Sequence, residues 1–230
     1  MKPLFKTIIC TFTVSLLSFT IIAQQSPNEE LIPKDPKAKA ILEALSAKTK
    51  TNTSIQATFS YNLYNKDEKM DETQTGKILM AGEKYKLDIA GQQIISDGKT
   101  LWTYIKDAEE VQIDNVNTEE NPDALSPNKI FTLYEEGFKY KYNGEETENG
   151  TTYELIKLFP IDANEKPFHT VVLKINKIKK ELYSAQLFYK DGNRYTYTLT
   201  NFKANVPVSN TDFTFNETNH PNVDFIDLRD

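Results

Sequence analysis

Apolar and polar residues alternate along four stretches of this chain, and this alternation restricts the possible folds more than any other feature of the sequence. In the first stretch, every second residue from Ile55 to Leu63 is apolar, with polar residues between them. The other stretches are residues 84–89, 138–142 and 195–200. Because successive side chains of a β-strand point to opposite faces, each stretch predicts a strand with one apolar face. The sequence therefore predicts a sheet that buries one of its sides.

Short turn signals separate these stretches. Asn-Gly and Asp-Gly dipeptides tolerate the positive φ angles of tight hairpin turns better than most residue pairs. Consecutive strands are therefore expected to be antiparallel neighbours, and the chain shows no fixed-period repeat and no linker between domains. The sequence predicts a single domain of about ten strands with two helices. The dipeptides are Asp97-Gly98, Asn143-Gly144, Asn149-Gly150 and Asp191-Gly192.

Two helices are expected to lie against this sheet. Asp35 can accept hydrogen bonds from the free amides at a helix start, and Pro36 suits the first helical position. A second, short helix is predicted after Ser126-Pro127, with its end at Gly137. The apolar residues of these helices that are expected to cover the sheet are Ile41, Leu42, Leu45, Ile130, Phe131 and Tyr134.

The N-terminus has the pattern of a secretory signal peptide. Lys2 and Lys6 precede an apolar run, residues 8–22, which ends at Ala23. A positive start followed by a run of this kind is typical of exported proteins. A retained transmembrane helix is the alternative, and it is less favoured because the run is at the lower limit of spanning length and no basic cluster follows it.

Export would leave a mature chain without cysteine. The one cysteine, Cys10, lies inside the apolar run, which is a poor position for lipid attachment. We expect residues 1–23 to be the signal peptide, residues 24–34 a flexible leader and residues 35–230 a single domain. Disulfides, thiol nucleophiles and thiolate metal sites are then excluded from the mature protein.

Charge and motif content argue against nucleic-acid binding and against catalysis. The formal net charge is −6 at pH 7 without a basic block, so phosphate backbones are repelled. His169 and His220 lack metal-ligand spacing, and no nucleotide-binding or nucleophile motif is present. Acidic pairs such as Glu145-Glu146 are expected to be solvated, with a glycan hydrolase as the alternative. We predict no catalytic residues, no cofactor and no metal.

The apolar side of the predicted sheet is rich in large side chains, since 11% of the residues are aromatic. A filled core is the simpler interpretation for any single Phe or Tyr. A strongly curved sheet with few covering helices can instead leave an apolar hollow. Such a hollow would suit acyl chains, because each methylene removed from water contributes roughly 0.8 kcal/mol. Both interpretations stay open at this point.

One segment of the chain resembles a known family. Residues Ser96–Tyr104, which read SDGKTLWTY, are similar to a motif of the LolA family of periplasmic outer-membrane lipoprotein carriers. Here a hairpin turn delivers Leu101 and Trp102 to the next strand. Other matching segments follow the order of the family pattern, so the resemblance extends from Pro36 to Asp227. These segments are Ile55–Phe59, Gly76–Met80, Tyr85–Leu87, Glu110-Val111, Phe213–Phe215 and Pro221–Asp224.

The resemblance implies an α+β fold that is mainly antiparallel β. This fold is an incomplete, half-open and strongly curved β-barrel, with helices covering its concave apolar face. It also implies a periplasmic carrier, not an enzyme, that binds lipoprotein acyl chains in a cavity and ferries lipoproteins from the inner to the outer membrane. The implied partners are acylated lipoproteins, an inner-membrane ATP-driven release complex and an outer-membrane acceptor. The carrier is expected to be a monomer.

The chain departs from this family at one position. In the proteobacterial branch an Arg-Pro pair precedes the aromatic residue of the third strand, and the arginine holds the lid closed. This chain instead has Gly82, Glu83 and Lys84 before Tyr85. Lys84 could supply the charge but not the planar, forked donor of an arginine. This chain is therefore not expected to have the family's arginine latch.

The alternation also predicts which residues line the concave face. If Trp102 lies near the cavity, its emission should respond to a fatty-acyl probe. An envelope sensor or scaffold of the same fold, which binds another lipid or none, is the alternative to a carrier. The predicted acyl-chain cavity is lined by Phe59, Tyr61, Ile78, Met80, Tyr85, Leu87, Ile89 and Leu101.

Overall fold

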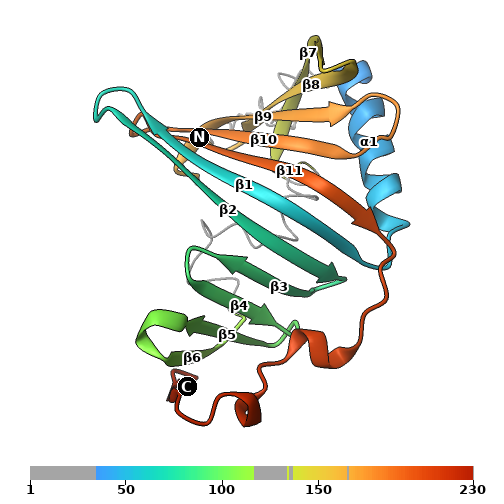
Figure 1. Cartoon of the computed structure of the whole chain (residues 1–230). Helices are drawn as coiled ribbons and strands as arrows, with labels where there is room; N and C mark the ends of the chain where they lie inside the picture. Colours follow the sequence, from blue (N-terminus) through green and yellow to red (C-terminus); the bar gives the residue numbers. More distant parts are fainter. Residues whose placement is uncertain (1–34, 117–133, 135–136, 165, 230) are drawn as a thin grey trace, which may run out of the picture. The chain divides into compact units, whose positions relative to one another are not determined.

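The computed structural model describes residues 35–116, 134, 137–164 and 166–229, and their arrangement is shown in Figure 1. The described residues form one α-helix, twelve strands and three short 3₁₀ helices. In chain order the elements are α1 (Pro36–Lys50), β1 (Ile55–Asn65), β2 (Met70–Ala81), β3 (Lys84–Ile89), β4 (Gln92–Ser96), β5 (Thr100–Ile105), η1 (Lys106–Ala108), β6 (Glu110–Asn115), β7 (Phe138–Glu148), β8 (Thr151–Pro160), β9 (Phe168–Asn176), β10 (Leu182–Tyr189), β11 (Arg194–Ala204), η2 (Asn210–Phe213), η3 (Glu217–Asn219) and β12 (Asp224–Asp227).

The twelve strands form one sheet in the order β12-β6-β5-β4-β3-β2-β1-β11-β10-β9-β8-β7. Two antiparallel meanders, β1 to β6 and β7 to β11, join where β1 pairs with β11. The outermost strands, β12 and β7, lie at opposite ends of this order, so the sheet is curved but not closed (Figure 1). The prediction of a mainly antiparallel, half-open curved sheet is confirmed. The described residues contain twelve strands, where the sequence predicted about ten.

Local turn chemistry explains most of these hairpins. Asp97-Gly98, Asn149-Gly150 and Asp191-Gly192 lie between consecutive strands, as predicted, and each glycine has a positive φ. Asn143-Gly144 does not form a turn, and that prediction is wrong. β7 continues through it with a shift in register between Tyr142 and Glu145. A bulge uses the same positive-φ glycine as a turn does, so the dipeptide alone does not distinguish the two.

The C-terminal strand is the exception to the antiparallel pattern. β12 pairs in parallel with β6, with Asp224 opposite Glu110. Parallel neighbours require a long connection, and the chain between β6 and β12 includes β7 to β11 before the segment with η2 and η3 brings it back beside β6 (Figure 1). The expectation that consecutive strands pair is therefore wrong for β11 and β12, and also for β6 and β7, which lie near opposite ends of the sheet order.

Helix α1 begins where the sequence predicted. The Asp35 carboxylate oxygen Oδ1 accepts hydrogen bonds from the backbone N–H groups of Lys37 (3.0 Å) and Ala38 (3.2 Å), and Pro36 occupies the first turn. The buried residues of the helix are Ala38, Ile41, Leu42 and Leu45. Of the second predicted helix, only Tyr134 and Gly137 fall in the described part of the chain.

The two faces of the sheet carry separate apolar clusters. The main cluster includes the buried residues of α1 and the inward residues of β1, β2 and β7 to β10. The second cluster lies on the opposite face of β4 to β6, where Ile95, Val111 and Ile113 pack with Phe215 of the C-terminal segment. Trp102 packs against this second cluster, whereas its neighbour Leu101 packs against the main one. The two residues therefore face opposite ways, as alternation along β5 requires.

Candidate ligand-binding site

All eight residues that the sequence predicted as a cavity lining lie on one face, within or against the main cluster. Cross-strand pairing brings several together, since Ile78 lies opposite Leu87 and Met80 opposite Tyr85. Four of the eight are buried and four are half-buried, so the face continues beyond the tightly packed part. The buried ones are Phe59, Ile78, Met80 and Tyr85; the half-buried ones are Tyr61, Leu87, Ile89 and Leu101.

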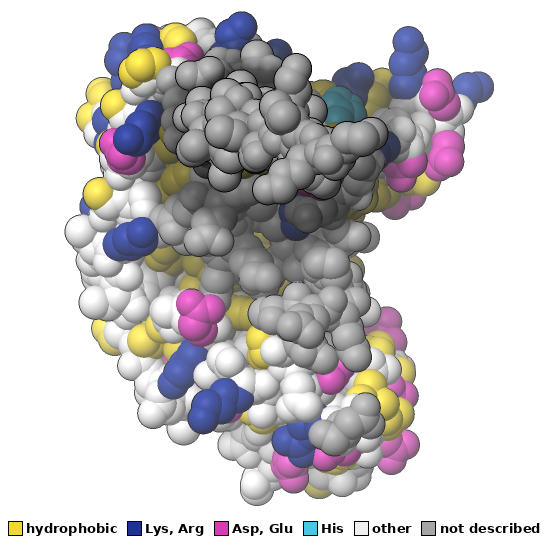
Figure 2. All heavy atoms as spheres, turned by 180° about the vertical axis from the view of Figure 1, so that it is seen from behind, with side chains coloured by type: hydrophobic (Ala, Val, Ile, Leu, Met, Phe, Trp, Pro, Cys, Tyr) yellow, Lys and Arg dark blue, Asp and Glu magenta, His cyan; other side chains and the backbone are white. Residues whose placement is uncertain are grey.

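Helix α1 covers part of this apolar face. Ile41, Leu42 and Leu45 are at most 6% exposed and belong to the main cluster. Tyr134, from the second predicted helix, is also buried in this cluster. Ile130 and Phe131, the other two predicted covering residues, lie outside the described residues. Figure 2 shows hydrophobic side chains along the hollowed side of the sheet and charged side chains at its rims.

Several residues on the same face were not predicted as part of the site. Tyr195, Tyr197 and Leu199 on β11 pack against the main cluster beside β1. Their alternation was visible in the sequence. The sequence did not predict the pairing of β11 with β1, because these strands are far apart in the chain. Without that pairing, the apolar face of β11 could not be joined to the face of β1.

The carboxylate of Asp35 joins α1 to the sheet. Its Oδ1 caps the helix, and its Oδ2 accepts a hydrogen bond of 2.8 Å from the backbone N–H of Tyr142 on β7. β7 is the last strand of the sheet, so this N–H lies on an edge that has no strand partner among the described residues. The pKa of Asp35 is lowered, first by the hydrogen bond from Tyr142 and then by the cap.

Charged side chains extend this attachment. The Lys37 ammonium lies 3.6 Å from the centre of the Tyr142 ring. The Tyr142 hydroxyl donates to Glu145 (3.3 Å), which also forms an ion pair with Lys177 (2.8 Å). These contacts hold the start of α1 against the region of β7 that contains the bulge.

An asparagine at position 35 should separate the two roles of this carboxylate. Asn is a good helix cap, but its amide NH₂ is a donor and cannot accept from the Tyr142 N–H. We expect the amides of α1 in Asp35→Asn to exchange hydrogen several-fold faster than in the natural protein, while β9 amides keep their rates. Equal exchange of α1 amides in both proteins would show that the Tyr142 bond does not hold the helix.

The comparison of Asp35→Asn with the natural protein should also depend on pH. The folded-state pKa of Asp35 lies below its ordinary value of 3.8. The stabilisation given by the ionised Asp35 carboxylate is therefore complete above pH 3.8 and is lost as the pH falls through the folded-state pKa. Lys37 of α1 and Lys141 of β7 are the cations near this carboxylate. The difference in α1 exchange between Asp35→Asn and the natural protein should therefore disappear in strong acid.

The carboxylates near this attachment do not favour glycan hydrolysis. Glu145 and Glu154 lie opposite each other on β7 and β8, as a pair of catalytic carboxylates could. However, the hydrogen bond from Lys177 lowers the pKa of Glu145, whereas a general acid needs a raised pKa. Glu154 is 5% exposed and forms an ion pair with Lys180 (3.1 Å). Both groups therefore act as ion-pair partners.

The histidines take no part in the apolar face. His169 is exposed and its Nδ1 lies 2.9 Å from the Thr170 hydroxyl. His220 stacks on Phe215 of the second cluster and lies beside Tyr104. Within the described parts of the chain, no three His, Cys, Asp or Glu side chains form a group that could hold a metal ion.

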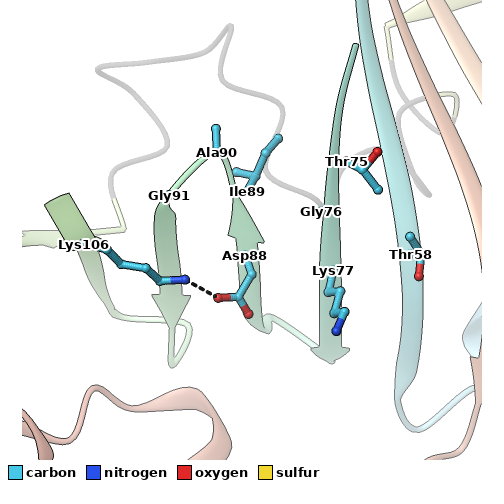
Figure 3. Close-up of a pocket in the computed structure, with 9 residues that line it drawn as sticks. All are labelled: Thr58, Thr75, Gly76, Lys77, Asp88, Ile89, Ala90, Gly91 and Lys106. Atoms are coloured by element: carbon cyan, nitrogen blue, oxygen red, sulfur yellow. Dashed lines mark hydrogen bonds and ion pairs between the residues drawn. The ribbon is translucent and has the colours of Figure 1, made fainter.

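A hollow of about 490 Å³ lies elsewhere, where the long β1–β2 hairpin passes the end of β3. Figure 3 shows Lys106 reaching toward Asp88, at a distance of 3.4 Å. Of the eight predicted lining residues, only Ile89 borders this hollow. It is therefore a different feature from the predicted acyl-chain cavity. Its lining consists of Thr58, Thr75, Gly76, Lys77, Asp88, Ile89, Ala90, Gly91 and Lys106.

Comparison of the sequence with protein families identifies one that covers most of the chain. The family described as "Outer membrane lipoprotein carrier protein LolA" matches residues 50–216. The chain belongs to the LolA family. A search of curated protein sequences finds no match.

Solved structures resemble this LolA family member at low sequence identity. An uncharacterized conserved protein from Thermus thermophilus has a TM-score of 0.55 and 12% identity, over 83% of this chain and 99% of that one. This similarity shows the fold. The lipoprotein LppX from Mycobacterium tuberculosis has a TM-score of 0.49 and 14% identity, over 76% of this chain and 98% of that one. A LolA superfamily protein from Nitrosomonas europaea has a TM-score of 0.43 and 14% identity, over 77% of this chain and 97% of that one.

A lysine of this LolA family member lies near the place of the family's arginine latch. Lys84, which stands near the position of the arginine latch, donates a hydrogen bond of 2.8 Å to Asn210 in η2. It thus contacts the C-terminal segment.

None of the helices among the described residues has the length and apolar character needed to cross a membrane.

Proposed function

We propose that this LolA family member is a carrier that binds the acyl chains of lipoproteins on its apolar face and ferries lipoproteins from the inner to the outer membrane. The observation that carries the proposal is the partial exposure of Tyr61, Leu87, Ile89 and Leu101. These side chains extend the packed cluster into a surface that an acyl chain can cover. Each methylene so buried contributes roughly 0.8 kcal/mol.

The covering helix supplies a way to admit the ligand. The apolar residues of α1 shield part of the face from water, and an acyl chain can replace those contacts when the helix moves. The closed and loaded states can therefore lie within a few kcal/mol of each other. Transfer then requires only an acceptor with a higher affinity than the carrier.

The location and partners follow from this role. We propose that residues 1–23 direct export and are removed, that residues 24–34 form a leader, and that residues 35–230 act in the periplasm as a monomeric domain. An inner-membrane ATP-driven complex would load the carrier, and an outer-membrane acceptor would unload it. No catalytic step, cofactor or metal is needed, because binding and release alone move the cargo.

Depletion of the protein in its own cells tests this role. Lipoproteins should accumulate in the inner-membrane fraction, while outer-membrane proteins without lipid anchors keep their normal distribution. Immunoblots of separated membranes with two unrelated lipoproteins measure the effect. A normal lipoprotein distribution after depletion, together with no acyl-probe binding by the purified protein, would instead support a sensor or scaffold.

A further inference from the structure

Four tyrosines form a continuous cluster on the apolar face, where β1, β10 and β11 lie side by side (Figure 1). Tyr61 and Tyr197 are directly opposite each other on β1 and β11. The ring centre of Tyr61 is 5.2 Å from that of Tyr197 and 5.8 Å from that of Tyr195. Tyr189 on β10 lies 4.6 Å from Tyr195, edge to face. We call these four residues the tyrosine cluster.

The tyrosine cluster lies at the boundary between packed core and accessible surface. In register, Tyr197 lies opposite the buried Ala185, and Tyr195 lies opposite the buried Leu187. All four tyrosines are themselves half-buried. Tyrosine suits such a boundary, because its ring packs against apolar groups while its hydroxyl can reach a polar partner.

Three of these tyrosines, Tyr61, Tyr195 and Tyr197, have hydroxyl groups that form no hydrogen bond with the described part of the chain. Burial raises the pKa of all three phenols above the ordinary value of 10.0. They therefore stay protonated at neutral pH, and each can donate one hydrogen bond.

The electrostatic surroundings indicate an uncharged acceptor. In the described part of the chain, the charged side chain that perturbs these phenols is Asp191, a carboxylate that raises the pKa of Tyr195. No Lys or Arg among the described residues contributes to the pKa shift of any of the three. From the described residues, a free fatty-acid carboxylate would therefore meet a negative charge and no cation. A neutral ester carbonyl accepts hydrogen bonds without that repulsion.

We propose that the tyrosine cluster binds the glyceryl-ester end of an acylated ligand. The phenol O–H groups donate to ester carbonyl oxygens, and the rings flank the first methylenes of each chain. The rest of each chain follows the apolar face toward Phe59 and Leu87. This inference rests on the proposed acyl binding. It adds that the tyrosine cluster recognises the ester end of the ligand.

Removal of the hydroxyls alone tests the inference. The variant Tyr61→Phe/Tyr195→Phe/Tyr197→Phe keeps all three rings, and the control Tyr104→Phe changes a tyrosine beside the second cluster, on the other face. Diphenylhexatriene, a fluorescent hydrocarbon without polar atoms, serves as the reporter. Dioleoylglycerol, a diacylglyceryl-cysteine lipopeptide and oleate are the competitors that displace it from the purified mature protein.

The natural protein should prefer both esters to oleate. In the triple variant the affinity for the reporter should be unchanged, and the affinity for both esters should fall at least tenfold, because the ester carbonyls lose their hydrogen-bond donors. Tyr104→Phe should behave like the natural protein. Stronger displacement by the lipopeptide than by dioleoylglycerol would identify the lipoprotein anchor as the source of the ester.

Three results would overturn the inference, and they differ in what else they exclude. Equal displacement by esters in the triple variant and the natural protein rejects the ester contacts and leaves acyl binding intact. Weakened binding of diphenylhexatriene by the triple variant assigns the tyrosines to packing. If the natural protein binds neither the reporter nor any acyl ligand, the proposed function fails together with the inference.

Discussion

A glutamate in place of Leu87 should abolish binding of fatty-acyl ligands to the folded protein. Leu87 is half-buried on the apolar face, where it lies opposite Ile78 on β2 and Ile94 on β4. An ionised carboxylate surrounded by hydrocarbon loses its hydration without a partner, which costs several kcal/mol. We expect the dissociation constant of a fluorescent fatty-acyl probe to rise at least tenfold, as measured by titration.

The matched control for this variant is Leu79→Glu. Leu79 is also half-buried, but it lies on the other face of β2, opposite Lys86. The same change of side chain there should leave acyl binding near the natural level, because the new carboxylate lies on the face of β2 opposite to Ile78 and Met80. If Leu87→Glu binds the probe as well as Leu79→Glu does, the residues assigned to the lining are wrong.

A single methyl group added at Gly76 should strongly destabilise the fold. Gly76 lies on β2 opposite Phe59 of β1 and Ile89 of β3. A Cβ atom at this position would overlap both the Phe59 ring and the backbone carbonyl oxygen of Asp88. The ring can move but the carbonyl belongs to a paired strand, so β3 must shift. We expect Gly76→Ala to cost about 2–3 kcal/mol, measured by urea unfolding.

Two further variants separate the causes of this loss. Thr75→Ala changes the exposed neighbour of Gly76 and should have little effect on the unfolding midpoint. Phe59→Leu combined with Gly76→Ala removes the overlap with the ring but not the overlap with the Asp88 carbonyl, so it should restore only part of the stability. An unchanged midpoint in Gly76→Ala would show that β2 and β3 do not approach so closely.

These two predictions address different properties of the same face. Gly76 permits the close approach of β1, β2 and β3 that brings Phe59, Ile78 and Leu87 together. Leu87 supplies part of the apolar surface that results. Gly76→Ala should therefore lose stability, whereas Leu87→Glu should lose binding while remaining folded, because the Leu87 side chain is only half-buried.

Features that depend on neighbours in the sequence could be predicted well. The start of α1 follows from Asp35 and Pro36, because a cap and a first-turn proline act within three residues of each other. The inward residues of β1 and β3 follow from alternation, because opposite orientation of successive side chains is a property of any strand. All eight predicted lining residues consequently lie on one face.

Features that depend on distant pairing could not be predicted. The bulge at Asn143-Gly144 is a local exception, because a turn and a bulge use the same positive-φ glycine and only the continued pairing of β7 with β8 distinguishes them. The covering of Trp102 depends on the C-terminal segment, which brings Phe215 to the opposite face of β4 to β6. Emission of Trp102 is therefore expected to report on that second cluster and not directly on an acyl chain at the main one.

The sequence by itself determined the strands, their apolar faces, the start of α1 and the membership of the LolA family, because alternation, capping and family motifs are written in short segments. The tertiary structure alone decided that β11 lies beside β1, which assembles the tyrosine cluster, and that Asp35 reaches Tyr142 on the last strand. The physical reason is that hydrogen bonding between strands depends on which edges meet. Many distant segments of this chain have similar alternation, so their local pattern does not specify their partners.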